Sequence, residues 1–194
     1  MEKKEIVLIG GGGHCKSCIE VIEATELYKV IGILELSLNV GKNVLNYPII
    51  GTDDDIPSLI FKKINFLITI GFIEDNKKRN ILFNQILSLG GKLPTIIAPT
   101  AYISKTSCIG IGTIVMHQAF INTSVVIGNN CIINTKAIIE HDAIIGDNCH
   151  ISTASVINGG VVVGSNTFYG SGAISKQYIK IPENSFIKAN SIVK

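Results

Sequence analysis

The chain has 194 residues, which is enough for one or two domains with a substantial core. Its formal net charge of +2 is small, and its dense basic run, Lys77-Lys78-Arg79, follows Glu74-Asp75, which predicts a solvated helix face. We therefore expect no nucleic-acid partner. No apolar stretch is long enough to cross a bilayer, so no membrane span is expected.

The beginning of the chain and its cysteines indicate a compartment. The N-terminus, MEKKEIVLIGGGG, runs into a strand and a glycine turn instead of a long apolar segment with a cleavage site. The number of cysteines, five, is odd, and Cys131 and Cys149 fall at inward positions of a repeat in the second half of the chain. A reduced, cytoplasmic protein is the simplest interpretation.

The first half of the chain predicts a small parallel α/β domain. An apolar run ends in a glycine turn, and a helical pattern begins at Ile19. Further apolar runs predict strands, and the segments between them predict helices. Most charged side chains precede residue 97, so we expect a Rossmann-like domain over 1–96 and a second domain over 97–194. The expected strands cover 5–9, 30–34, 66–70 and 94–97, and the expected helices cover 53–63, with Asp53 or Asp54 as N-cap, and 76–89.

The glycine turn, Gly10 to Gly13, has two interpretations. It does not satisfy the dinucleotide-binding pattern G-x-G-x-x-G, because Cys15 or Lys16 stands where the last glycine belongs. Free backbone N–H groups at a helix start nevertheless attract phosphate, and a tight turn without a ligand fits the spacing equally well. Cys15-Lys-Ser-Cys18 has the form of a redox pair, but nothing else in the sequence supports such a site.

The second half of the chain is an internal repeat of six residues. Framed from Ile97 in steps of six, Ile or Val fills every first position up to Ile187 except Tyr169 and Ser175, and every fifth position except Ile179 is compact. A unit that cannot bury its apolar face alone must stack on its neighbours, so the product is a solenoid. Three short strands would close a triangular coil, and glycines would provide positive φ and room for the next coil at one corner. These glycines are Gly110, Gly128, Gly146 and Gly164.

The hexads from Ile97 to Ile192 resemble the left-handed parallel β-helix of the hexapeptide-repeat acyltransferases, and that resemblance implies the left-handed winding. Gly10, Gly13, His14 and Lys16 match the G-x-x-G-H-x-K opening of bacterial sugar O- and N-acetyltransferases of the NeuD and PglD type. The resemblance implies acetyl-CoA as co-substrate and an α/β domain that binds the nucleotide of a nucleotide-linked sugar.

The same resemblance implies a substrate site in the α/β domain. Glu35 would lie near the base or ribose, although one acid stands here where some relatives have two, and Gly71 would lie beside the nucleotide. The residues expected to face the diphosphate or sugar are Gly10, Gly11, Gly12, Gly13 and His14.

Three histidines lie in or beside the repeat. The coil phase places His150, His117 and His141 on three different sides, so one chain cannot bring them to a common point outside the prism. This argues against a metal site within a single chain, and we expect no metal. His141 lies in Ile138-Ile-Glu-His-Asp142, which resembles the I-E-H-[DE] signature of the acetyltransferases and implies that His141 is the general base.

The chemistry of acetyl transfer needs such a base. An attacking amine or hydroxyl must lose a proton, and a carboxylate on the other ring nitrogen would fix the tautomer of the imidazole. Asp142 and Glu140 are both candidates for that carboxylate. The resemblance also implies Asn134 near the sugar and His150 near the thioester of acetyl-CoA. Because His141 and His150 face different sides, a homotrimer with active sites at its subunit interfaces is expected.

Small residues of the solenoid would bind the pantetheine arm of coenzyme A in the same way as in the relatives. Cys149 lies beside His150 but at an inward position, so direct transfer is favoured over an acyl-enzyme. The chain lacks the C-terminal tail that helps hold the adenine end in many relatives, which leaves Lys188 and Lys194 as candidates for the 3′-phosphate contact. The positions that match the pantetheine contacts are Asn158, Gly159, Gly160, Ser171, Gly172 and Ala173.

The sequence therefore predicts an acetyl-CoA-dependent N-acetyltransferase that acts on a nucleotide-linked amino sugar in surface-glycan biosynthesis. An alternative is O-acetylation of a sialic acid or a related sugar, because residues 151–159 and 164–171 also resemble the sialic-acid O-acetyltransferase branch. A non-catalytic solenoid scaffold is a further alternative. The identities of the sugar and of the nucleotide stay open.

Overall fold

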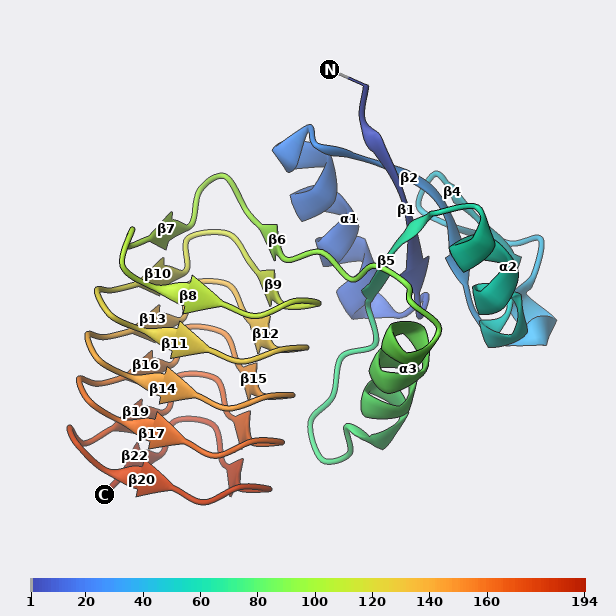
Figure 1. Cartoon of the computed structure of the whole chain (residues 1–194). Helices are drawn as coiled ribbons and strands as arrows, with labels where there is room; N and C mark the ends of the chain where they lie inside the picture. The colour runs from blue at the N-terminus through green and yellow to red at the C-terminus, as the bar shows by residue number, and fades with distance from the viewer. Residues whose placement is uncertain (1) are drawn as a thin grey trace. The chain divides into compact units, whose positions relative to one another are not determined.

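The computed structural model describes residues 2–194 and divides into two compact units. One unit consists of the chain up to Gly71 together with Lys77–Pro94, and the other consists of Phe72–Asn76 together with Thr95–Lys194. The first is an α/β unit and the second is a three-sided solenoid (Figure 1). Phe72–Asn76 therefore belongs to the solenoid, although its neighbours in the chain belong to the α/β unit.

The α/β unit is a mainly parallel sheet with three helices. Its elements are β1 (Lys4–Ile9), α1 (Gly13–Thr25), β2 (Tyr28–Leu34), η1 (Ser37–Asn39), β3 (Asn43–Val44), β4 (Tyr47–Gly51), η2 (Asp53–Asp55), α2 (Ile56–Phe61), β5 (Asn65–Ile68) and α3 (Lys77–Ser88). The strand order is β3-β4-β2-β1-β5, and only the β3–β4 pair is antiparallel. Val7 and Ile9 of β1 pack with Ile56 of α2 and Leu82 of α3. Leu8, on the opposite face of β1, is buried as well.

Most of the predicted elements of this unit are confirmed within a few residues. The hairpin β3–β4 does not stand out in the sequence, because its first strand has only two residues and its second contains Pro48. The prediction of Asp53 or Asp54 as N-cap is wrong. Thr52 Oγ1 accepts a hydrogen bond from Asp54 N (3.3 Å), and Thr52 N donates to Asp55 Oδ2 (2.9 Å), which is a capping box. Within residues 2–194, no helix combines the length and apolarity needed to cross a bilayer.

The basic run at the start of α3 is not simply a solvated helix face. Arg79 is 1% exposed, and its guanidinium donates hydrogen bonds to the carbonyls of Ile68 and Ile70, the second at 3.2 Å. The prediction is wrong for Arg79, because a charged side chain can be buried when carbonyl groups accept its hydrogen bonds. The sequence alone does not reveal that the start of this helix lies beside the end of β5.

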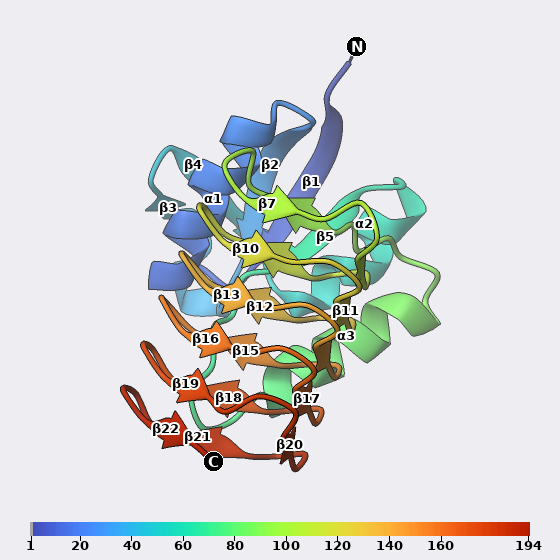
Figure 2. The ribbon, with the colours of Figure 1, turned by 90° about the vertical axis from the view of Figure 1, so that its left-hand side faces the viewer.

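The solenoid is a left-handed parallel β-helix with three faces. Each strand has two residues, and each pairs in parallel with a strand of the next coil, as Phe120 does with Ile138. Figure 2 shows these strands stacked one above another. The first face consists of β6 (Ile96–Ile97), β9 (Ile114–Val115), β12 (Ile132–Ile133), β15 (His150–Ile151), β18 (Phe168–Tyr169) and β21 (Phe186–Ile187). The second consists of β7 (Tyr102–Ile103), β10 (Phe120–Ile121), β13 (Ile138–Ile139), β16 (Val156–Ile157), β19 (Ile174–Ser175) and β22 (Ile192–Val193), and the third of β8 (Cys108–Ile109), β11 (Val126–Ile127), β14 (Ile144–Ile145), β17 (Val162–Val163) and β20 (Lys180–Ile181).

The core of the solenoid follows the hexad pattern. Aliphatic first positions such as Ile139 and compact fifth positions such as Cys131 and Cys149 are fully buried, as predicted. Tyr169 and Ser175, which interrupt the aliphatic row, also point inward. The apolar run 94–97 contains β6, which pairs with β9 of the solenoid and not with the α/β sheet to which the sequence assigned it.

The corners of the coil follow a rule that the glycine spacing does not predict. Every sixth residue from Gly112 to Asn190 has φ between 54° and 68°. The four glycines of the eighteen-residue series are not among them, so the prediction that they provide positive φ is wrong. Their predicted role in close approach is confirmed, since a Cβ on Gly128 would lie 2.7 Å from Asp147 N and 2.8 Å from Gly146 C.

Ala154 occupies one of these corner positions, with a φ of 54°. Because alanine in this conformation loses about 1 to 2 kcal/mol, we expect Ala154→Gly to raise the free energy of unfolding by about 0.5 to 1 kcal/mol after the entropic cost of glycine. Urea unfolding of the variant and the wild type measures the change. Ala24→Gly in helix α1 is the matched control, and there the same substitution should lower stability by about 0.5 to 1 kcal/mol. Equal losses at both positions would contradict the strain at the corner.

Candidate functional site

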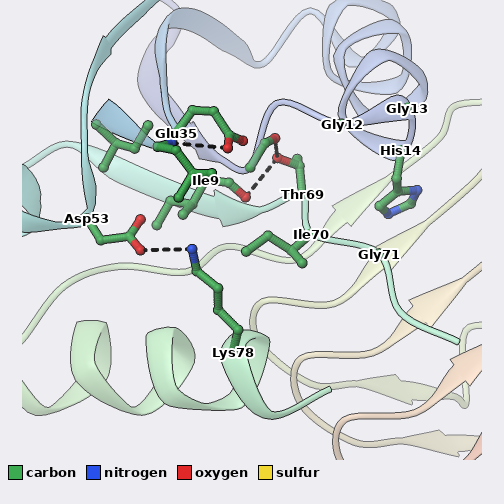
Figure 3. Close-up of a pocket in the computed structure, with 13 residues that line it drawn as sticks. Ile9, Gly12, Gly13, His14, Glu35, Asp53, Thr69, Ile70, Gly71 and Lys78 are labelled. Atoms are coloured by element: carbon green, nitrogen blue, oxygen red, sulfur yellow. Dashed lines mark hydrogen bonds and ion pairs between the residues drawn. The ribbon is translucent and has the colours of Figure 1, made fainter. Parts of the chain in front are cut away.

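The α/β unit has a pocket of about 430 Å³ at the carboxyl ends of β1, β2 and β5. A crevice at this edge, where the strand order changes direction, is the usual ligand site of open parallel sheets. Figure 3 shows the residues that line it. Six of the residues predicted to bind substrate lie in its wall, namely Gly10, Gly12, Gly13, His14, Glu35 and Gly71.

The glycines of the turn differ in why the position favours glycine. Gly10 has a φ of +102°, and a Cβ there would lie 2.5 Å from Ile70 Cγ1. A Cβ on Gly12 or Gly13 would meet nothing within 4 Å, so the space before their backbone is open. Gly12 is the N-cap of α1 and has no side chain that could satisfy the N–H groups of the first turn. The turn therefore offers an uncovered helix start to a ligand in the pocket.

The carboxylate of Glu35 is held by the backbone around it. Gly11 N donates to Glu35 Oε2 at 2.6 Å, and Leu36 N donates to Oε1 at 3.1 Å. Gly11 itself lines an adjoining hollow of about 320 Å³, together with Glu35 and Val44. Each carboxylate oxygen can accept more than one hydrogen bond, so Glu35 is fixed in place and still able to accept from a hydroxyl or amide of a ligand.

The pocket is also lined by residues that the sequence did not predict to bind a ligand. Thr69 Oγ1 lies 2.6 Å from Gly10 O and 3.0 Å from Ile9 O, so it holds the end of β1 against the end of β5. Lys78 Nζ lies 3.3 Å from Asp53 Oδ2, and both side chains line the pocket (Figure 3). These residues come from elements far apart in the sequence, so no local motif contains them.

The cysteines at the start of α1 do not form a redox site. Cys15 and Cys18 are free and buried, and burial raises the pKa of both thiols. A redox pair at a helix start would instead need a lowered pKa and access to solvent. His14 Nε2 lies 3.4 Å from Cys18 Sγ, which ties the histidine of the glycine turn to its own helix.

His141 lies in the solenoid, at the corner between the second and third faces. Its Nδ1 lies 2.8 Å from Asp142 Oδ2, and the two side chains are 43% and 64% exposed. Asp142 is one of the corner residues, with a φ of 59°. Glu140 instead accepts a hydrogen bond from Asn122 Nδ2 at 2.6 Å. Of the two carboxylates that the sequence left open, Asp142 is therefore the one bonded to the imidazole.

The next coil of the solenoid brings Gly159 against the ring of His141. A Cβ on Gly159 would lie 2.6 Å from His141 Nε2 and 2.7 Å from its Cε1. Gly160 N donates to His141 O at 2.9 Å and so holds the two coils in register. The imidazole of His141 can lie in this position because Gly159 has no side chain.

The positions expected to contact coenzyme A divide between two corners. Asn158, Gly159 and Gly160 follow β16 and share the corner of His141. Ser171, Gly172 and Ala173 follow β18, at the corner between the first and second faces. One group lies at each end of the second face, so the two groups of residues are not in contact within one chain.

His150 lies on β15 of the first face and is 8% exposed. Thr135 N donates to Asn134 Oδ1 at 2.8 Å, so the other amide atom, Nδ2, donates to His150 Nε2 at 3.1 Å. Nδ1 then carries the proton and donates to Phe72 O at 2.7 Å. The structure thus brings Asn134 and His150 together. It does not bring them to His141, which lies at the corner opposite the first face.

Among residues 2–194, no group of three or more His, Cys, Asp or Glu side chains is placed to hold a metal ion. His117 lies at the corner between the first and second faces, where its Nδ1 is 2.7 Å from Thr100 Oγ1. The three histidines of the solenoid therefore occupy three separate places.

Two family models match the chain. The PglD N-terminal domain matches residues 5–86, and the bacterial transferase hexapeptide model, which covers six repeats, matches residues 124–159. No curated protein sequence matches the chain significantly.

Solved structures match both units. The acetyltransferase domain of PglB from Neisseria gonorrhoeae is 27% identical, with a TM-score of 0.92 over 99% of this chain and 92% of its own. The same domain in complex with acetyl coenzyme A is 26% identical, with a TM-score of 0.90 over 99% of this chain and 93% of its own. A histidine-to-asparagine variant of perosamine N-acetyltransferase from Caulobacter crescentus, in complex with CoA and GDP-perosamine, is 32% identical, with a TM-score of 0.90 over 98% of this chain and 88% of its own.

A hexapeptide-repeat β-helix that follows an α/β unit of the PglD type defines a hexapeptide-repeat acyltransferase. Within this class, the chain belongs to the bacterial sugar O/N-acetyltransferases of the NeuD/PglD type. It is an acetyl-CoA-dependent sugar acetyltransferase, as the resemblance of its motifs implied.

Proposed function

We propose that the protein transfers an acetyl group from acetyl-CoA to the amino group of a nucleotide-linked amino sugar in surface-glycan biosynthesis. The observation that carries the proposal is the exposed His141–Asp142 pair, with Nδ1 and Oδ2 at 2.8 Å. The pocket of the α/β unit supports the nucleotide part, and the perosamine N-acetyltransferase with bound GDP-perosamine supports an amine as acceptor. The free thiols of all five cysteines support a cytoplasmic location.

The chemistry proposed for His141 is general base catalysis of direct transfer. With its proton on Nδ1 and bonded to Asp142, the ring presents Nε2 as a base. The amine nitrogen bonds to the acetyl carbonyl carbon while its proton passes to Nε2. The carbon–sulfur bond then breaks, and the thiolate of coenzyme A takes the proton from the imidazolium. Cys149 is fully buried, which supports a route without an acyl-enzyme.

The orienting carboxylate is proposed to be Asp142. We expect Asp142→Asn to lower kcat by about tenfold to a hundredfold, because the imidazolium loses its charged partner and the preferred tautomer is no longer fixed. Glu140→Gln is the matched control. Its amide can still bond Asn122, so kcat should change little. Steady-state rates of CoA release measure both, and a larger loss for Glu140→Gln would reverse the assignment.

We further propose a homotrimer whose active sites combine residues of two chains. The support is that His141 lies at the corner opposite the face that holds Asn134 and His150, so that a site using all three needs a second copy. Asn158, Gly159, Gly160, Ser171, Gly172 and Ala173 remain the proposed contacts for acetyl-CoA, and His150 is proposed to act near the thioester. Light scattering of the purified protein tests the trimer.

The acceptor is tested with a panel of sugars. Nucleotide-linked 4-amino sugars are compared with free and CMP-linked sialic acid, and thiol release from acetyl-CoA is followed. Turnover of the amino sugars is the expected result. Turnover of hydroxyl acceptors alone would replace the proposal by sugar O-acetylation, and no turnover with any acceptor would favour a scaffold.

A further inference from the structure

Helix α3 begins with an arrangement of charge that disfavours a helix. Lys77, Lys78 and Arg79 form its start, and its first turn contains no acidic residue. The N-terminus of a helix carries a partial positive charge, so basic side chains there are unfavourable, even though Glu74 and Asp75 precede the helix. Local rules of this kind are broken most often at functional sites.

Arg79 has a structural reason for its position, since it is buried against the carbonyls of Ile68 and Ile70. Through these bonds it attaches the start of α3 to the end of β5, which is one wall of the pocket. No comparable structural contact explains the position of Lys78 at the start of α3. Its side chain is about half exposed, and its Nζ forms an ion pair, at 3.3 Å, with Asp53.

The charges in the pocket wall are unequal. Among the described residues that line it, Lys78 alone is a lysine or arginine, and the two carboxylates are Glu35 and Asp53. Glu35 is held by two backbone N–H groups, whereas Asp53 forms an ion pair with Lys78, and both of these side chains line the pocket (Figure 3). An anionic ligand that enters beside the open glycine turn meets one lysine, and the ion pair of that lysine with Asp53 is partly exposed to solvent.

We propose that Lys78 binds the diphosphate of the nucleotide-linked substrate and that Asp53 competes with the diphosphate for it. In the empty pocket Lys78 pairs with Asp53, and on binding it exchanges that carboxylate for a phosphate oxygen. Asp53 thereby lowers the affinity for the diphosphate, because its ion pair with Lys78 must break first, and it leaves the affinity for a nucleoside unchanged. This inference rests on the proposed function for the nature of the ligand.

The test is calorimetric binding of UDP and GDP, and of uridine and guanosine, to the full-length protein. Lys78→Met should weaken binding of the better diphosphate by about tenfold to a hundredfold, the scale of a hydrogen bond to a charged group, and should leave the nucleoside unchanged. It should also reduce the salt dependence of diphosphate binding. Asp53→Asn should tighten diphosphate binding by about twofold to fivefold, the scale of an exposed ion pair. Lys77→Met, one residue away and not in the pocket wall, is the matched control.

Equal losses for diphosphate and nucleoside, or none, in Lys78→Met would overturn the inference. Weaker diphosphate binding in Asp53→Asn would overturn the competition, since it would make Asp53 a ligand contact. If UDP and GDP bind through Lys78 but no sugar is acetylated, the proposed function fails and the inference stands. If neither diphosphate binds the wild type at millimolar concentration, the inference fails, whereas acetylation of a sugar without a nucleotide would still be measurable.

Discussion

Replacing His141 by alanine should lower kcat for acetyl transfer by about 10² to 10⁴-fold, which is the range expected for loss of a positioned general base. The KM for acetyl-CoA should change little, because in the proposed mechanism the imidazole acts on the acceptor in the transition state and does not bind the co-substrate. CoA release with the best amino-sugar acceptor measures both constants. An unchanged kcat would remove His141 from the role of base.

The proposed position of the site between two chains gives this experiment a second arm. If His141 comes from one chain and His150 from its neighbour, co-expression of His141→Ala with His150→Asn should restore activity at about a quarter of the interfaces, since random assembly of two variants leaves that share with both residues intact. Each variant expressed alone serves as the control. Mixed trimers that regain no activity would place the complete site within a single chain.

The fold could be predicted from the sequence because its repeat is long and local. An eighteen-residue period sets each strand against its copy in the next coil, so the parallel register of Phe120 with Ile138 follows from spacing alone. The eighteen-residue glycine series does not predict the corner conformation, because these glycines stand two residues before the positions with positive φ. Asparagines six or eighteen residues apart, at 130, 148, 166, 184 and 190, mark the left-handed corner positions, and this signal was present in the sequence.

The residues of the site could be predicted only in part. Gly10 to His14 form one turn, so a motif identifies them, whereas Thr69, Asp53 and Lys78 reach the same pocket from three separate elements. A lone threonine or lysine carries no local signal, although the basic start of α3 could have pointed to Lys78. The sequence left open whether Asp142 or Glu140 bonds to His141, because this depends on the three-dimensional arrangement, in which Asp142 bonds to the imidazole and Glu140 bonds to Asn122.

Gly159→Ala should lower kcat, because it adds one methyl group beside the proposed base. The φ of Gly159 is not left-handed, so the backbone tolerates alanine, but the new Cβ would lie 2.6 Å from His141 Nε2. The imidazole must therefore move, and a base displaced by about 1 Å costs about a hundredfold in kcat. Folding should be retained, with an unfolding midpoint near that of the wild type.

Because Gly159 is also a proposed contact for coenzyme A, the variant must separate two causes of lost activity. In the His141→Ala background, where the base is already missing, Gly159→Ala should lower kcat no further, since two changes that act through one group are not additive. A raised KM for acetyl-CoA in both backgrounds would instead assign the effect to the pantetheine path. Gly159 would then act by contacting coenzyme A, and the prediction that it positions His141 would be wrong.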